Sequence, residues 1–208
     1  MEIIVTHVSA DFDAFAGMVA AKKIFPKAII IMPTAINPNV RKFISLYEDE
    51  LPLLHEASDI DFSCVKRAVI VDTRIISRTG LAERTLRDPD IEVIAYDHHI
   101  KKGTGFHSDF DHSRETGAST TILVEHIRER RINISSLEAT IFLAGIYEDT
   151  GSFTYPGTTS ADLEAGAYLM EKQANLFVVL KFLNLSLSAQ QHRLLERLIM
   201  NCRKVKIN

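Results

Sequence analysis

Acidic and histidine side chains follow the first apolar segment of the sequence at close spacing. His7, Asp11 and Asp13 fall within the stretch VTHVSADFDAFAG, directly after the apolar run IIV. Carboxylate oxygens and imidazole nitrogens are ligands of divalent metal ions. A stretch of this kind is also common in solvated loops. Its meaning therefore depends on whether other segments bring similar groups to the same place.

Similar groups recur where two later apolar segments end. Asp72 ends the run RAVIVD, and Asp97, His98 and His99 are consecutive in YDHHIKK. Asp72 alone could cap a turn, and adjacent histidines occur on surfaces by chance. If the apolar runs are parallel strands, however, their carboxyl ends lie along one edge of the sheet, where ligands bind. The recurrence predicts that these side chains meet in one site.

Asp149 adds a carboxylate of a different kind. It ends the helix pattern 136–149 shortly before Gly151, where helices commonly terminate. The negative end of the helix dipole opposes a carboxylate at this position. A bound cation would remove that conflict, although a helix-end aspartate can also be merely structural.

The donor set points to one kind of chemistry. Carboxylates with imidazole and no usable thiolate favour Mn²⁺, with Mg²⁺, Fe²⁺ or Co²⁺ as alternatives, over structural zinc. Several carboxylates in one pocket repel one another unless cations neutralise them, and there are enough ligands for two ions. Two ions about 3.5–4 Å apart that share a carboxylate can activate water for in-line attack on phosphorus. The predicted reaction is phosphoester hydrolysis.

The first half of the sequence alternates short β-branched runs with helix patterns. Strands are predicted at 2–5, 28–32, 67–72 and 91–97, and helices at 13–25, 39–51 and 77–88. This order predicts an α/β fold with a doubly wound, mainly parallel sheet flanked by helices.

The second half is rich in helix patterns. They cover 119–131, 136–149, 160–173 and 176–185, and an amphipathic pattern follows at 188–204. Ser135 and Glu138 have the spacing of a capping box for the helix at 136–149. The apolar stripes at 160–173 and 176–185 fit either burial against the sheet or a homodimer face.

Composition narrows the range of partners. The 208 residues carry a net charge of −3, with 46% hydrophobic and 25% charged residues, so no overall basic footprint favours long duplex nucleic acid. The two cysteines, Cys64 and Cys202, are too far apart for a zinc site or a disulfide framework and fit a cytoplasmic location. No apolar run approaches the roughly 20 residues of a membrane span.

Four motifs in this order resemble those of the DHH phosphoesterases. HVSADFD, VDTR, DHH and EDTGSF are similar to the four motifs of that family, and the resemblance covers about residues 1–185. It implies that His7, Asp11 and Asp72 hold one metal ion, and that the second is held by Asp13, Asp72, His98 and Asp149. The resemblance further implies catalytic roles for Asp72, His98, His99 and Asp97. His99 would face the substrate phosphate or support its protonation, and Asp97 would orient a histidine.

The resemblance also implies a domain organisation. Residues 1–185 would form the DHH catalytic domain, and residues 186–208 a connector helix to a C-terminal substrate-binding domain. The glycine-rich motif of that second domain does not occur in the sequence. A contribution of such a domain to turnover is therefore an open expectation.

Other residues are weaker candidates for substrate contact. Gly117 and Ser119 precede or begin a predicted helix, whose free N–H groups could bind an anion or simply form a cap. Arg74 follows Asp72 and could neutralise phosphate. Surface positions are the more ordinary explanation for Arg74 and for Lys101 and Lys102; His107 and His112 remain open.

The expected function is hydrolysis of phosphodiester bonds in short oligonucleotides or small nucleotides. One alternative is an inorganic pyrophosphatase or exopolyphosphatase. Another is a metal- and nucleotide-binding regulatory module of a multidomain protein that resembles tRNA nucleotidyltransferases and carries CBS domains. A processive single-strand exonuclease is less favoured, because the sequence lacks a basic channel.

Overall fold

Six parallel strands form the sheet of the protein. The computed structural model describes residues 1–99, 108–183 and 189–202, and within them the strand order is β3-β2-β1-β4-β5-β6. The strands are β1 (Glu2–Val5), β2 (Ile29–Met32), β3 (Leu54–Glu56), β4 (Arg67–Val71), β5 (Glu92–Tyr96) and β6 (Phe110–Asp111). The order reverses between β1 and β4, which is where ligands bind in sheets of this kind. The doubly wound α/β fold predicted from the sequence is confirmed.

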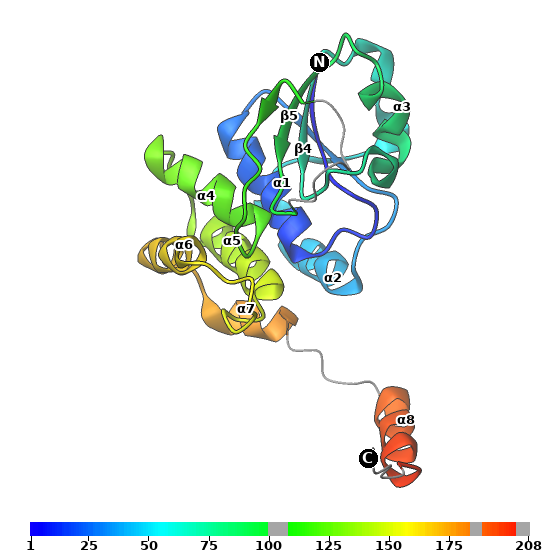
Figure 1. Cartoon of the computed structure of the whole chain (residues 1–208), viewed down its shortest axis with the longest axis vertical. Coiled ribbons are helices and arrows are strands. Elements are labelled where there is room, and N and C mark those ends of the chain that lie inside the picture. The colour runs from blue at the N-terminus through cyan, green and yellow to red at the C-terminus, as the bar shows by residue number, and fades with distance from the viewer. Residues whose placement is uncertain (100–107, 184–188, 203–208) are drawn as a thin grey trace, which may run out of the picture.

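The α-helices gather mainly on one side of the sheet. They are α1 (Phe12–Ile24), α2 (Pro38–Tyr47), α3 (Glu83–Leu86), α4 (Ser119–Glu129), α5 (Ser136–Asp149), α6 (Ser160–Glu171), α7 (Leu176–Leu183) and α8 (Ala189–Met200). Helix α1 packs against α4 and α5, and α5 in turn contacts α6 and α7, as Figure 1 shows. The predicted capping box of α5 is present, with Ser135 and Glu138 bonded to each other's backbone amides.

Alternation of side chains along the strands creates two apolar layers. Ile4, Val69 and Tyr96 belong to the larger cluster, beneath α1, α4 and α5. Ile3 and Ile70 face the other way, into a smaller cluster that is closed by α3 and short 3-10 turns. The predicted strands are nearly all apolar because both faces are covered.

Two strands and two helices differ from the sequence-based expectation. β3 and β6 lie at the sheet edges, and their short sequences LHE and FD carry no β-branched residue that would predict a strand. The predicted helix 77–88 is instead a 3-10 segment at Ile76–Ala82 followed by the single turn of α3. Gly80, with φ of 63°, interrupts the helical geometry there.

Helix α2 ends earlier than its pattern predicts, at Tyr47 instead of residue 51. The next residues, Glu48, Asp49 and Glu50, form a 3-10 turn. Three carboxylates oppose the negative end of the helix dipole, and Pro52 restricts the residue before it to an extended conformation. None of the helices in the described ranges is both long and apolar enough to cross a membrane.

Candidate metal centre

The predicted ligands converge beyond the carboxyl ends of β1, β4 and β5, together with the end of α5. Three groups of side chains each place their oxygen and nitrogen atoms within 4.8 Å of one another. The groups are His7–Asp11–Asp72, Asp13–Asp72–His98–Asp149 and Asp72–Asp97–His98–His99. The first two have the same members as the ligand sets implied by the motifs. Asp72 belongs to all three.

Asp72 has this central place because the backbone turns sharply as it leaves β4. Its φ is 58°, in the left-handed region, and its amide donates a 2.8 Å hydrogen bond to the carbonyl of Tyr96. Its Oδ2 lies 3.2 Å from Nε2 of His7, and its Oδ1 lies 3.5 Å from Nε2 of His98. The hydroxyl of Ser119 donates to Oδ1 over 2.8 Å. Each oxygen of one carboxylate therefore faces a different histidine.

Helix α1 begins with two carboxylates that have different supports. Asp11 is the N-cap and accepts a 3.0 Å backbone hydrogen bond from the first turn. Asp13 is fully buried and accepts hydrogen bonds from the amides of Ser119 and Thr120, over 2.7 and 2.9 Å. Burial, followed by the charge of Asp72, raises the pKa of both carboxyls. The start of α4 therefore binds an anion from within the chain.

The orientation of His98 is fixed by its backbone contact. Its Nδ1 lies 3.2 Å from the carbonyl of Thr116, so Nδ1 is the donor and Nε2 faces the carboxylates. Nε2 is 3.1 Å from Oδ2 of Asp149. Burial alone lowers the pKa of His98, but Asp149 and the other carboxylates outweigh it and raise the pKa to about 10. This site strongly favours a positive charge.

Two unpartnered atoms mark the same place. Among the described residues, the buried side-chain atoms without a well-aligned hydrogen bond are Oδ2 of Asp97 and Nε2 of His98, whose contact with Asp149 is an ion pair by distance. Such atoms are uncommon in proteins and raise the free energy of the folded state. A divalent cation would offset the repulsion between the carboxylates and would take the place of the proton on Nε2 of His98. The donor set therefore fits a divalent metal ion.

Asp97 holds His99 in a defined position. Oδ1 of the buried Asp97 accepts from the backbone amide of His99 over 3.0 Å and lies 2.9 Å from its Nδ1. The side chain of His99 is 54% exposed, whereas that of Asp97 is inaccessible. The imidazole is therefore anchored at one edge and open at the other.

Glu148 lies outside the three ligand groups but next to Asp149 in the sequence, and the sequence analysis gave it no role. Its Oε2 accepts a 2.5 Å hydrogen bond from the amide of Phe12, at the start of α1. Burial raises its pKa to about 7, and the charges of Asp11 and Asp149 act in the same direction. Its position next to Asp149 was the available signal.

Asp162 is a second residue that the sequence analysis missed. It is fully buried at the start of α6 and accepts hydrogen bonds from the amide of Gly117 over 2.8 Å and the hydroxyl of Thr121 over 2.5 Å. It also closes a capping box with Thr159, a spacing that is visible in the sequence TSAD. Asp162 thus fixes the segment that supports Asp13 and Asp72.

The weaker candidates for substrate contact are bonded within the chain. The amides of Gly117 and Ser119 donate to Asp162 and Asp13. Arg74 donates to Asp111 over 2.5 Å and to the hydroxyl of Ser113 over 3.1 Å. Substrate contacts at Gly117, Ser119 and Arg74 therefore remain predictions.

The remaining candidates have different outcomes. His112 stacks on Tyr96, with ring centroids 4.8 Å apart, and is in none of the three ligand groups. The predictions for Lys101, Lys102 and His107 lie outside the described residues.

Comparison with protein families gives a match over most of the chain. The model of the DHH family, N-terminal domain, matches residues 2–146. An A-adding tRNA nucleotidyltransferase of Geobacter sulfurreducens is 38% identical over 100% of this chain and 24% of its own length. The cyclic-di-AMP phosphodiesterase GdpP of Bacillus subtilis is 30% identical over 87% of this chain and 29% of its own length. The chain thus spans 24% and 29% of the lengths of these two relatives.

Solved structures share the fold at low sequence identity. An exopolyphosphatase-related protein from Bacteroides fragilis superimposes with a TM-score of 0.75 and 18% identity, over 96% of this chain and 61% of the other. A putative family II inorganic pyrophosphatase of Methanococcus jannaschii gives a TM-score of 0.64 and 21% identity, over 88% and 61%. At these identities the likeness concerns the fold alone.

Proposed function

Because this chain belongs to the DHH family, we propose that it is a metal-dependent phosphoesterase that hydrolyses phosphodiester bonds of short oligonucleotides or small nucleotides. The observation that carries the proposal is the position of Asp72, which offers one oxygen towards each of two ligand groups. A shared carboxylate is the feature that a two-ion site requires and that a single-ion site does not.

The chain supplies ligands for two ions in this proposal. One ion would be held by His7, Asp11 and Asp72, and the other by Asp13, Asp72, His98 and Asp149. We propose Mn²⁺, with Mg²⁺ or Co²⁺ as alternatives, because the donors combine carboxylates with imidazole. When bound, the ions would supply an activated water and would offset charge on the phosphoryl oxygens.

The protein's own groups prepare the rest of the site. Asp97 accepts from Nδ1 of His99, which leaves Nε2 at the exposed edge free to take up a proton and, as the imidazolium, to donate to a phosphoryl or leaving oxygen. The amides of Ser119 and Thr120 hold Asp13 in place. The carboxylates are therefore positioned before substrate arrives, which favours rapid chemistry.

The phosphodiester assignment is supported by the likeness to GdpP, which extends over 87% of this chain. An inorganic pyrophosphatase or exopolyphosphatase is the alternative enzyme. The likeness to the A-adding tRNA nucleotidyltransferase supports another alternative, a binding module within a larger protein. Residues 1–185 would be the catalytic part and 186–208 the connector, within which α8 carries exposed leucines.

Hydrolysis of a linear dinucleotide with Mn²⁺ tests the proposal. The parent chain should release mononucleotides, and Asp72→Asn should lower the rate by about 100-fold or more, because both ligand groups lose a charged member. Asp49→Asn, in an exposed turn outside the site, is the matched control and should keep the parental rate.

Each other result has a defined meaning. Release of phosphate from pyrophosphate, with no cleavage of the dinucleotide, would replace the proposal with the pyrophosphatase alternative. Tight nucleotide binding without products from either substrate would favour the binding module. Equal rates for the parent and Asp72→Asn would overturn the shared-carboxylate assignment.

A further inference from the structure

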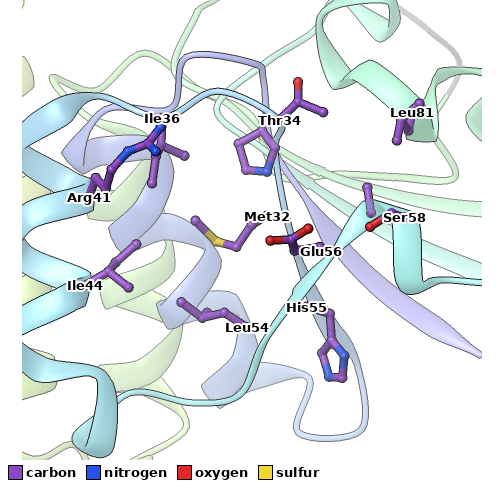
Figure 2. A pocket seen from close by; sticks show the side chains of 12 residues that line it. Met32, Thr34, Ile36, Arg41, Ile44, Leu54, His55, Glu56, Ser58 and Leu81 are labelled. Carbon is purple, nitrogen blue, oxygen red and sulfur yellow. The ribbon is translucent and has the colours of Figure 1, made fainter.

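A pocket lies beside the carboxyl ends of β2 and β3, outside the metal cluster. Its volume is about 550 Å³, within the range of about 300–1,000 Å³ that is typical of small-molecule sites. Figure 2 shows its lining, which comes from the ends of β2 and β3, from the start of α2 and from the 3-10 segment at Leu81. None of the residues assigned to metal binding lines this pocket.

The floor of the pocket is apolar. Met32 and Leu54 come from adjacent strands, and Ile44 comes from α2. All three are only partly buried, so their apolar surface remains accessible. A methionine thioether beside branched aliphatic side chains offers a polarisable surface for an aromatic ring. The floor therefore fits a flat, aromatic ligand better than an inorganic anion.

Two charged side chains line the same pocket without partners among the described residues. Arg41 extends from α2 and Glu56 from the end of β3. Neither side chain forms a hydrogen bond or ion pair with another residue in the described ranges, and both are exposed. A carboxylate is an acceptor only and a guanidinium a donor only, so a complementary ligand presents donors at one end and an anion at the other.

The pocket adjoins the loop that carries the metal ligands of β1 and α1. Ile36, on the pocket wall, pairs with Ala10, and the amide of Asn37 donates to the carbonyl of Ala10 over 2.8 Å. A second, narrow cavity of about 10 Å³ shares Met32 with the pocket and reaches Thr6, the neighbour of His7. A ligand in the pocket is thus separated from the metal centre by one loop.

We propose that this pocket binds the guanine base of a nucleotide substrate, with a terminal, non-scissile phosphate beside Arg41. The inference rests on the proposed function, because a nucleotide phosphodiesterase needs a site for a base as well as one for the scissile phosphate. Guanine carries two adjacent donors, N1–H and the exocyclic amine, which match the two oxygens of Glu56. Adenine and cytosine each present a single amino donor on that edge. Bases are commonly recognised through this edge while the ring packs on a side-chain surface.

Calorimetric binding of GMP and AMP to the full chain in EDTA tests the pocket separately from catalysis. GMP should bind about ten-fold more tightly than AMP, the discrimination expected of one bidentate pair. Glu56→Gln should abolish the preference. Arg41→Gln should weaken the binding of GMP but leave the binding of guanosine unchanged, since only GMP carries the phosphate. Glu50→Gln, an exposed substitution outside the pocket, is the matched control.

The outcomes separate this inference from the proposed function. Asp72→Asn should retain GMP binding even where hydrolysis is lost, and a GMP preference that persists in a chain without hydrolase activity would support the pocket alone. Equal binding of GMP and AMP, or an unchanged preference in Glu56→Gln, would overturn the guanine assignment. If dinucleotides are cleaved in that case, the proposed function stands without it.

Discussion

Ser119 donates its hydroxyl to Oδ1 of Asp72 over 2.8 Å, and both side chains are almost inaccessible to solvent. This bond ties the start of α4 to the carboxylate that faces both ligand groups. We expect Ser119→Ala to weaken Mn²⁺ binding by about ten-fold, as is typical when the support of a metal ligand is removed.

Isothermal titration of Mn²⁺ into the variant and the parent measures that effect. Ser160→Ala is the control, because Ser160 also begins a helix, α6, but does not contact the cluster. An unchanged affinity in Ser119→Ala would show that Asp72 is positioned by the backbone alone.

Asp11→Asn should stabilise the protein in the absence of metal ions. Burial and the charge of Asp72 raise the pKa of Asp11 above its unfolded value, so its ionised form opposes folding. Stability therefore falls as the pH rises from the unfolded pKa of 3.8 through the raised value, and asparagine removes this loss while it keeps the N-cap. We expect a rise in Tm of about 1–3 °C near pH 7 in EDTA.

In saturating Mn²⁺ the parent should instead be more stable than Asp11→Asn. The parent gains stability from the bound ion, whereas Asp11→Asn has lost a charged ligand and gains less. Thermal unfolding of both proteins in EDTA and in Mn²⁺ checks the prediction. If Asp11→Asn is less stable than the parent under both conditions, Asp11 acts only as the N-cap of α1 and not as a metal ligand.

Asp162→Ala should destabilise the protein strongly. The substitution leaves the amide of Gly117 and the hydroxyl of Thr121 buried without an acceptor. Loss of a buried charged acceptor with several donors should lower the free energy of unfolding by about 3–5 kcal/mol. Urea denaturation of the variant and the parent measures this free energy. Asp49→Ala, at an exposed position, should change the free energy little, and comparable losses in both variants would contradict this role.

Gly145→Ala should loosen the contact between α1 and α5. A Cβ at position 145 would lie 2.8 Å from Cβ of Ala16 and 3.1 Å from the backbone oxygen of Phe12. Two packed helices must separate to accept it, at a cost of about 1–3 kcal/mol. Because α5 carries Asp149, Mn²⁺ affinity should fall as well. Gly157→Ala, where a Cβ meets nothing within 4 Å, is the control for both measurements.

The sequence predicts the central part of this fold well because the central strands are covered on both faces. RAVIVD and IEVIAYD have a single reasonable interpretation, and the acidic residues after them then share one sheet edge. The edge strand LHE has no such pattern, since its place depends on pairing with β2 rather than on its own residues.

The supporting residues of the candidate site were harder to predict for a similar reason. Asp162 acts on Gly117 from a distant part of the chain, and spacing within one segment does not reveal such a contact. Ser119 was identified as the start of a helix, and its amide donates to Asp13, a partner that spacing within one segment does not reveal. The local sequence identifies an available hydrogen-bond donor, but which acceptor it binds is determined by the tertiary structure.

The ligand side chains are spread along most of the chain, and this determines when during folding they come together. His7 precedes α1 and Asp149 ends α5, so nearly all of the packed body must be assembled before the donors meet. During synthesis, an emerging chain that still lacks α5 would hold at most part of the set. Tight metal binding would then occur only once the fold is complete. A bound ion would stabilise the native state after folding rather than nucleate folding.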